Sequence, residues 1–163
     1  MNKNDFSTKT AHGAVFVGME DIGELIIERI AAGQSVELSP RGRSMLPMLR
    51  EGVDSVTLSP APNRLSKYDI PLYRRSDGSY ILHRVVDVSD GKYTMCGDNQ
   101  FRLEKGIDHD RVIAVVSGFS RGKKRYSTKS ASYRIYVALW CGSRPLRYFA
   151  HRVIRKLKRI FGK

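Results

Sequence analysis

A serine lies among residues that bend the backbone in the segment RGRSMLPML, residues 41–49. Gly42 and Pro47 are typical of turns, and the methionines and leucines around Ser44 would anchor such a turn in an apolar core. A serine hydroxyl is a weak nucleophile that needs a base within hydrogen-bonding distance. The segment therefore has two interpretations: a tight turn that joins two strands, or a turn that presents Ser44 for nucleophilic attack.

Four histidines could supply that base. His83 lies inside an expected core strand, YILHRVV. The others lie in a polar N-terminal segment, between two aspartates and in a basic segment, at His12, His109 and His151 respectively. Taken alone, a strand histidine is more often structural than catalytic. A pair of Ser44 and His83 therefore needs support from neighbouring motifs.

That support comes from five segments which, in this order, resemble the signal peptidase I and LexA-like superfamily of serine peptidases: GRSMLPML, GVDSV, LSKYDIPLYRR, YILHRVV and YTMCGDN. The superfamily carries a Ser-Met-x-Pro box, a Gly-Asp-Ile-Val strand, a Lys-Arg-Val or His-Arg-Val box, and a Gly-Asp-Asn box. The motif His83-Arg84-Val85 is similar to the branch with a histidine base, the signal peptidases of the endoplasmic reticulum and of archaea. The resemblance covers residues 34–120, about half of the chain.

The resemblance implies that Ser44 forms the acyl-enzyme and that His83 is the general base, which later protonates the leaving amine. The family often has a hydroxyl side chain two residues before the nucleophile. Gly42 has no side chain, so backbone N–H groups near Ser44 would have to bind the oxyanion. The residues implied in this bend are Gly42, Arg43, Met45 and Pro47.

The family's site also contains an acid that orients the histidine, because a carboxylate fixes the imidazole tautomer and stabilises the imidazolium. Asp98 in the Gly-Asp-Asn box is the favoured candidate, and Glu104 is the second. The nearby Asp108 and Asp110 are further alternatives. We expect no metal and no cofactor, because no group of histidines and cysteines has metal-ligand spacing. Residues implied to support the base and the acid are Arg84, Gly97 and Asn99.

Two departures from the family's pattern affect these expectations. Tyr68-Asp69-Ile70 stands where the family has Gly-Asp-Ile, which changes a turn. The membrane anchor of signal peptidases is also missing: the segment MNKNDFSTKTAHG is polar, and no stretch reaches the roughly 18–20 apolar residues of a membrane span. We therefore expect a cytoplasmic protein, with a peripheral position on the inner membrane face as the alternative.

The basic excess of the chain is confined to its C-terminal third. The net charge is +13 over 163 residues, yet residues 1–110 hold 14 Lys and Arg against 16 Asp and Glu, and residues 111–163 hold 15 Lys and Arg and no acid. The length suits one domain with appendages. Two cysteines, Cys96 and Cys141, are too few for a disulfide framework at this length, which favours a reducing compartment.

The hydrophobic pattern predicts a mainly β domain. Helical spacing of apolar residues predicts a helix over residues 19–32, closed by Gly33. About six short strands follow, which is typical of a folded β-sheet or partial barrel, and the resemblance implies the LexA and signal-peptidase-like version of that fold. Alternating and β-branched residues place these strands within residues 35–39, 53–59, 70–75, 79–89, 92–96 and 111–119. The expected organisation is a flexible N-terminus, a catalytic domain, a basic serine-rich linker and a helical tail, over residues 1–18, 19–120, 121–132 and 133–163.

The C-terminal segment has the pattern of a basic amphipathic helix that Pro145 can open. Such a helix is typical of a segment that lies on an anionic membrane surface. A helix packed on its own domain with a solvated basic face is the alternative, and nucleic-acid binding is less favoured. The expected membrane-surface residues are Trp140, Arg147, Arg152, Arg155, Lys156 and Arg159.

These features together predict a serine endopeptidase that cleaves a leader, a preprotein or another peptide through an acyl-enzyme. The resemblance implies that the substrate adds to the site as an extended strand and has small side chains just before the cut. The alternative is a LexA-like regulatory or peptide-binding module with little or no proteolytic activity. Residues 1–33 offer one helix and no helix-turn-helix pair, so a repressor-style DNA reader is not expected.

Overall fold

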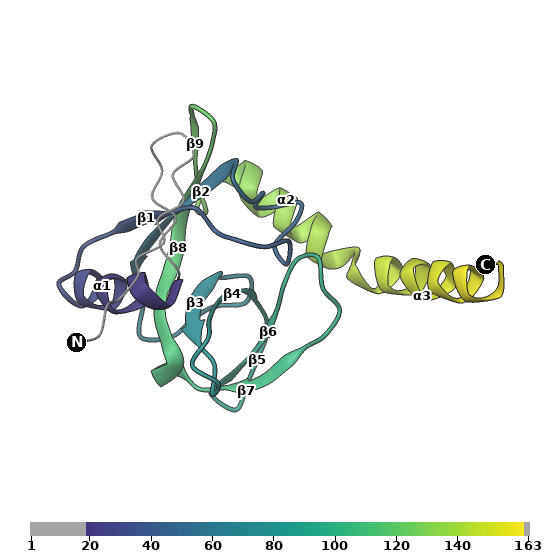
Figure 1. The fold of residues 1–163 in the computed structure, drawn as a ribbon, viewed down its shortest axis with the longest axis horizontal. Coiled ribbons are helices and arrows are strands. Elements are labelled where there is room, and N and C mark those ends of the chain that lie inside the picture. The colour runs from purple at the N-terminus through teal and green to yellow at the C-terminus, as the bar shows by residue number, and fades with distance from the viewer. Residues whose placement is uncertain (1–18, 162–163) are drawn as a thin grey trace, which may run out of the picture.

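The computed structural model describes residues 19–161, so the expected flexible segment 1–18 lies outside the described residues. The elements are α1 (Met19–Ala31), β1 (Val36–Leu38), β2 (Asp54–Pro60), β3 (Pro71–Arg74), β4 (Tyr80–Leu82), β5 (Arg84–Ser89), β6 (Lys92–Cys96), β7 (Glu104–Ile107), the 3₁₀ turn η1 (His109–Arg111), β8 (Val112–Arg121), β9 (Lys124–Ser127), α2 (Ala131–Gly142) and α3 (Arg144–Phe161). The strands are antiparallel, and α1 precedes them in the chain while α2 and α3 follow them, as Figure 1 shows.

The larger sheet is organised around β8. Its strand order is β1-β2-β8-β3-β4, and β9 pairs with β8. Strand β3 pairs with residues 112–115 of β8. Strand β9 pairs with residues 118–121 of β8, so β3 and β9 lie along the same edge of β8, opposite β2. Val56 and Leu58 of β2 point into the core with no exposed surface, because alternate residues of a strand face the same side.

A smaller sheet, β5-β6-β7, packs its own apolar cluster beside the larger one. The chain passes from one sheet to the other between β4 and β5, at His83. The prediction of one continuous strand over residues 79–89 was therefore wrong at this residue. The mainly β prediction is confirmed, whereas the sheets formed by residues 19–161 do not close into a barrel.

Helix α1 covers one face of the larger sheet and ends where the sequence predicts. Ile26 and Ile30 are buried in the main apolar cluster. Gly33 has a φ of +76°, and the N–H of Gln34 donates to the carbonyl of Arg29 at 3.0 Å, so a left-handed residue closes the helix. Glycine suits this position because other residues pay a steric cost there.

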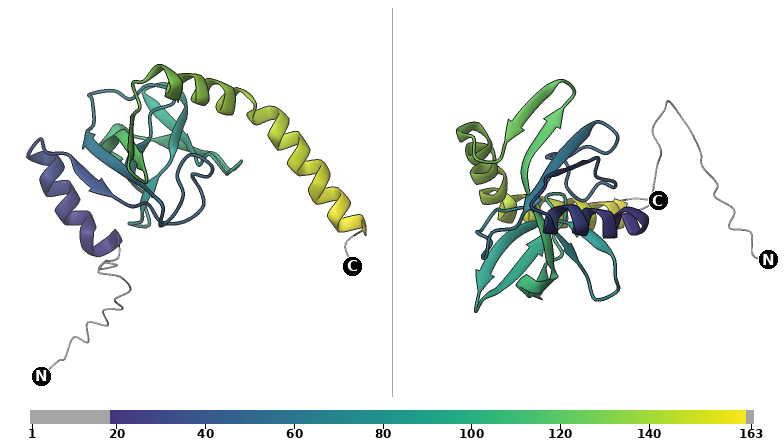
Figure 2. Two further views of the ribbon diagram at one scale, coloured as in Figure 1. Left: turned by 90° about the horizontal axis from the view of Figure 1, so that it is seen from above. Right: turned by 90° about the vertical axis from the view of Figure 1, so that its left-hand side faces the viewer.

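The predicted linker 121–132 is structured, which corrects that expectation. β8 continues to Arg121 and turns back into β9 through Gly122, and α2 begins directly after Ser130, whose side chain accepts a hydrogen bond from the N–H of Tyr133. Tyr133 and Val137 of α2 are buried against the domain. Helix α3 then extends away from both sheets, as Figure 1 and the left view of Figure 2 show.

Candidate active site

The segment that carries Ser44 is a turn anchored by buried side chains. Residues 44–48 form consecutive turns between β1 and β2. Met45 and Met48 are buried in the main apolar cluster, while Ser44 stays partly exposed. Gly42 has a φ of +86°, a left-handed conformation that favours glycine, so this residue redirects the backbone two positions before Ser44.

His83 lies at the junction of the two sheets and is almost fully buried. Its Nδ1 is 3.1 Å from Oε1 of Glu104 and 3.5 Å from the hydroxyl of Tyr73. A carboxylate can only accept, so Nδ1 carries the hydrogen and Nε2 is left free to take a proton. Burial lowers the pKa of His83 below its ordinary value, and Glu104 opposes that effect only in part. The ring is therefore neutral at neutral pH, as a general base must be.

Glu104 is held in place from the other side by Arg75. Nε of Arg75 donates to Oε2 of Glu104 at 2.6 Å, and its Nη2 donates to Oε1, the oxygen that also receives Nδ1 of His83. Burial alone would raise the pKa of Glu104, but hydrogen bonds from Arg75 and Tyr73 hold it below the ordinary value. The carboxylate of Glu104 is thus ionised and held between Arg75 and His83.

The sequence favoured Asp98 as the acid that orients His83, and that expectation was wrong because Asp98 contacts Arg84 instead. Both of its carboxylate oxygens accept from Arg84, at 2.7 and 2.6 Å, in a buried bidentate pair. Arg84 also donates to the carbonyl of Tyr68 and to the hydroxyl of Tyr133. Burial disfavours the charged guanidinium, but Asp98 outweighs it and raises the pKa of Arg84. Asp98 is a structural partner of Arg84, and Glu104 occupies the position beside His83.

The two remaining alternatives for the acid lie elsewhere. Asp108 forms an exposed ion pair with Lys92 at 3.0 Å, and Asp110 lines a separate cavity. Neither makes a hydrogen bond to His83 among the interactions of residues 19–161. Glu104 is therefore the acidic side chain that the fold brings to the ring.

Gly97 and Asn99 connect the nucleophile turn to the base. A Cβ at Gly97 would lie 2.6 Å from the carbonyl oxygen of Ser44 and 3.1 Å from Nε2 of His83, so only glycine fits between them. The backbone N–H of Asn99 donates to that same Ser44 oxygen at 2.8 Å, and its side-chain amide donates to the carbonyl of Arg43 at 3.2 Å. The Gly-Asp-Asn box thus places Nε2 of His83 beside the Ser44 segment.

Ser44 and His83 line one small cavity of about 90 Å³ together with residues of β4. Within the part of the chain that the structure describes, the hydroxyl of Ser44 makes no hydrogen bond to His83 or to any other side chain. The backbone N–H of Ser44 likewise has no acceptor there. The site therefore holds an unengaged hydroxyl, an unengaged N–H and a proton-accepting nitrogen around one cavity.

Sequence reasoning missed Tyr73 and Arg75, although a signal for both exists. They are two residues apart, with Tyr73 in β3 and Arg75 directly after it, so an extended chain places them on one side. Both contact the histidine and acid network, Tyr73 through Nδ1 of His83 and Arg75 through Glu104. A tyrosine and an arginine alternating beside apolar residues in IPLYRR were the available clue.

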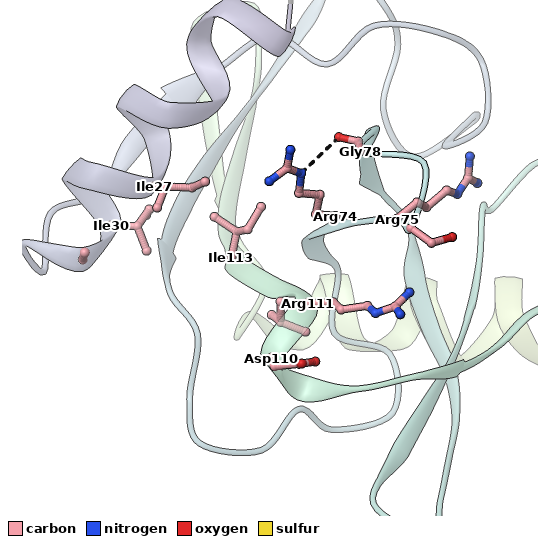
Figure 3. Close-up of a pocket in the computed structure, with 11 residues that line it drawn as sticks. Ile27, Ile30, Arg74, Arg75, Gly78, Asp110, Arg111 and Ile113 are labelled. Atoms are coloured by element: carbon pink, nitrogen blue, oxygen red, sulfur yellow. Dashed lines mark hydrogen bonds between the residues drawn. The ribbon is translucent and has the colours of Figure 1, made fainter.

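A larger cavity of about 670 Å³ lies between α1, the turn after β3 and the start of β8, and Figure 3 shows its lining. Ile27, Ile30 and Ile113 form its apolar side. Arg74, which donates to the carbonyl of Gly78 at 3.3 Å, and Arg111 lie across from them. Neither Ser44 nor His83 lines this cavity, but Arg75, which holds Glu104, does, so the cavity adjoins the candidate site.

Two residues expected on a membrane surface are held against the domain instead. The indole N–H of Trp140 and the guanidinium of Arg147 each donate to the carbonyl of Asp98 at 3.3 Å. Arg147 also lies 3.8 Å above the Trp140 ring. Of the other four, Arg152, Lys156 and Arg159 are exposed, and the side chain of Arg155 lies outside the described residues. The C-terminal helices thus contact the loop after β6, whose Gly97 lies between His83 and the Ser44 carbonyl.

Among the described residues, no group of three or more histidine, cysteine, aspartate or glutamate side chains could hold a metal ion. Comparison of the chain with protein-family models, curated proteins and solved structures gave no match. Any functional assignment therefore has to follow from the side chains themselves.

Proposed function

We propose that the chain is a serine endopeptidase in which Ser44 is the nucleophile, His83 the general base and Glu104 the acid that orients it. The observation that carries this proposal is the placement of His83, with Nδ1 on a carboxylate and Nε2 beside the Ser44 segment. A serine, a histidine and a carboxylate in these roles are the groups that acyl transfer needs. The resemblance of the motifs to the histidine branch of signal peptidases supports the same chemistry.

In the proposed reaction Nε2 of His83 takes the hydroxyl proton of Ser44 as the oxygen attacks the peptide carbonyl. The carbonyl oxygen becomes an oxyanion, and the unengaged N–H of Ser44, beside the nucleophile, is a donor that can bind it. The imidazolium then gives its proton to the leaving amine as the C–N bond breaks. Water hydrolyses the resulting ester through the same base and releases Ser44.

The substrate in this proposal is an extended peptide that pairs with β4. That strand is the last one of the larger sheet and pairs only with β3 within the described sheet, so one edge is open to another strand. The cavity of about 90 Å³ beside Ser44 has room for a small side chain and excludes a large one. Cleavage after small residues, as the resemblance implies, agrees with that volume.

The experiment compares protein N-termini in cells that carry the parent chain and cells that carry Ser44→Ala. We expect a set of new N-termini that disappears with Ser44→Ala and also with His83→Gln. Ser66→Ala is the matched control, because Ser66 is exposed and its hydroxyl makes no hydrogen bond within the described residues. Identical N-termini from the parent and Ser44→Ala would exclude the peptidase.

One observation favours a second function, a module that binds peptides without cutting them. The hydroxyl of Ser44 makes no hydrogen bond to His83 in the described structure. Catalytic hydrogen bonds are often long without substrate and tighten on binding, so the peptidase remains the preferred assignment. The two functions differ in one result: a peptide-binding module would retain peptide affinity in the parent chain but release no product.

A further inference from the structure

Helix α3 contacts its own domain through polar side chains. The guanidinium of Arg144 donates to Sγ of Cys96 and, at 3.4 Å, to the carbonyl of Gln100. Arg147, one turn later, donates to the carbonyl of Asp98. These bonds fix the start of α3 on the loop that follows β6, with arginines at the contact in place of apolar side chains.

The next turn of α3 continues the same contact. The rings of Tyr148 and His151 lie 5.4 and 5.2 Å from the ring of Phe101, measured between centroids. Arg147, Tyr148 and His151 lie three, four and seven residues after Arg144, so the four side chains share one face of the helix. The domain therefore binds the polar face of α3.

The opposite face of α3 is apolar and has no cover within the described chain. Leu146 is 71% exposed and Phe149 is 66% exposed. Val153 and Leu157 extend the same row at helical spacing and are also exposed, with Ile154 beside them. A helix that packed its apolar face on its own domain would bury this row, whereas in α3 the row is exposed and polar and aromatic side chains make the contact.

The charges around this apolar face select the kind of partner. Arg152, Lys156 and Arg159 are exposed on the remainder of the helix, and residues 111–163 contain no acid. A second copy of α3 would bring basic side chains together with no carboxylate from either segment to pair with them. No helix of the described residues is long and apolar enough to cross a bilayer.

We propose that α3 lies in the plane of an anionic lipid surface, with Leu146, Phe149 and the row that continues to Leu157 inserted among the acyl chains. The exposed arginines and lysine then meet lipid phosphates at the rim of the inserted row. Trp140 and Arg147 take no part in this surface, because both are held on the carbonyl of Asp98. The proposal does not depend on the peptidase assignment.

Flotation of the full chain with vesicles tests the proposal. Vesicles of phosphatidylcholine and phosphatidylglycerol in equal parts should bind the parent chain, and vesicles of phosphatidylcholine alone should bind it at least tenfold more weakly. Leu146→Gln with Phe149→Gln should lower the affinity for the anionic vesicles by about tenfold or more, since two large apolar side chains leave the bilayer. Replacing Arg152, Lys156 and Arg159 by Gln should lower it by about fivefold per charge, an effect that high salt removes.

The control is Leu25→Gln, because Leu25 is also exposed but lies on α1, at the other end of the molecule in Figure 1. Leu25→Gln and Ser44→Ala should both bind the vesicles as the parent does.

Unchanged vesicle binding by the Leu146 and Phe149 double variant would overturn the proposal. So would concentration-dependent dimers of the parent that this double variant abolishes, because the apolar face would then belong to a second copy. Equal binding to RNA by parent and double variant, with no binding to vesicles, would overturn it in favour of nucleic acid.

Discussion

Nδ1 of His83 lies 3.1 Å from Oε1 of Glu104, and this contact decides which nitrogen of the ring faces the serine. Because the carboxylate engages Nδ1, Nε2 is the nitrogen on the side of Ser44. A Cβ added at Gly97 would contact both Nε2 and the Ser44 carbonyl, so these two groups lie on either side of Gly97. The same carboxylate is clamped by Arg75, so the ring is oriented by a group that is itself fixed. A proton acceptor with a set tautomer and a set direction is what a general base requires.

Glu104→Gln should lower the pKa of His83 further below its ordinary value. Burial and Arg75 both lower that pKa, and the carboxylate of Glu104 is the largest of the effects that raise it. NMR titration of the His83 ring measures the change without any substrate. If the proposed chemistry holds, the rise of kcat with pH also moves to lower pH, and kcat on its plateau falls on the order of 10³-fold because the tautomer is no longer fixed.

Asp110→Asn is the control for this titration, since Asp110 is an exposed acid of the neighbouring turn η1 and makes no hydrogen bond to His83 within residues 19–161. It should leave the pKa of His83 unchanged. A pKa of His83 that stays constant or rises in Glu104→Gln would contradict the electrostatic link between the two residues.

Gly97→Ala should destabilise the fold and misalign the site. The added Cβ would lie 2.6 Å from the backbone oxygen of Ser44, a contact that only a shift of the turn can relieve. Overpacking of this kind costs about 1–3 kcal/mol, which urea unfolding measures. Gly142→Ala is the matched control, because a Cβ there meets nothing within 4 Å and alanine favours a helix. Equal free energies of unfolding for the two variants would show that Gly97 is not tightly enclosed.

Asp98→Asn should lower the free energy of unfolding by about 3 kcal/mol, because it leaves the charge of buried Arg84 without its counter-ion. The pair is almost completely excluded from solvent, with side-chain exposures of 1% and 3%. Asp108→Asn removes an exposed pair with Lys92 and should cost less than about 1 kcal/mol. A loss for Asp98→Asn as small as that for Asp108→Asn would mean that solvent reaches Arg84 after the change.

The hydrophobic pattern located five of the strands, each of which lies within one sheet. β1, β3 and β6 fall inside predicted segments, whereas β2 and β8 extend one and two residues beyond theirs, to Pro60 and Arg121. In β2 buried residues alternate with half-buried ones, as the pleat of a strand requires. The break at His83 left no such signal, since apolar residues are frequent through both β4 and β5. Only the pairing of β4 with β3 and of β5 with β6 separates them, and pairing is a property of the whole fold.

The choice between the two acids shows the same limit at the site. Asp98 was favoured because it stands inside the Gly-Asp-Asn box, yet the nearest buried cation to it is Arg84. Glu104 reaches His83 because β7 pairs with β6 and because Arg75 holds the carboxylate from the end of β3. Residues from three elements, the end of β3, the β4–β5 junction and β7, meet there, so spacing along the sequence could not rank the candidates.

Trp140→Phe combined with Arg147→Met should loosen the loop that holds the Ser44 segment. Both residues donate to the carbonyl of Asp98, and the next residue, Asn99, donates its N–H to the carbonyl of Ser44 at 2.8 Å. Without the two donors the loop opens more often, so the Asn99 amide hydrogen should exchange with solvent faster. Each lost hydrogen bond is worth about 1 kcal/mol, which predicts at least a tenfold faster exchange for the double variant.

Arg152→Met is the matched control for this exchange experiment. Arg152 is an exposed arginine of the same helix, and its guanidinium lies over the ring of Tyr148, which also belongs to α3. It should leave the exchange of the Asn99 amide at the parent rate. A general loss of stability would speed exchange across β2 and β8 as well, whereas a local release of the loop changes Asn99 and leaves those strands protected. Parent-like exchange at Asn99 in the double variant would mean that the Ser44 contact is held from within the β domain, because the C-terminal helices would then add nothing to it.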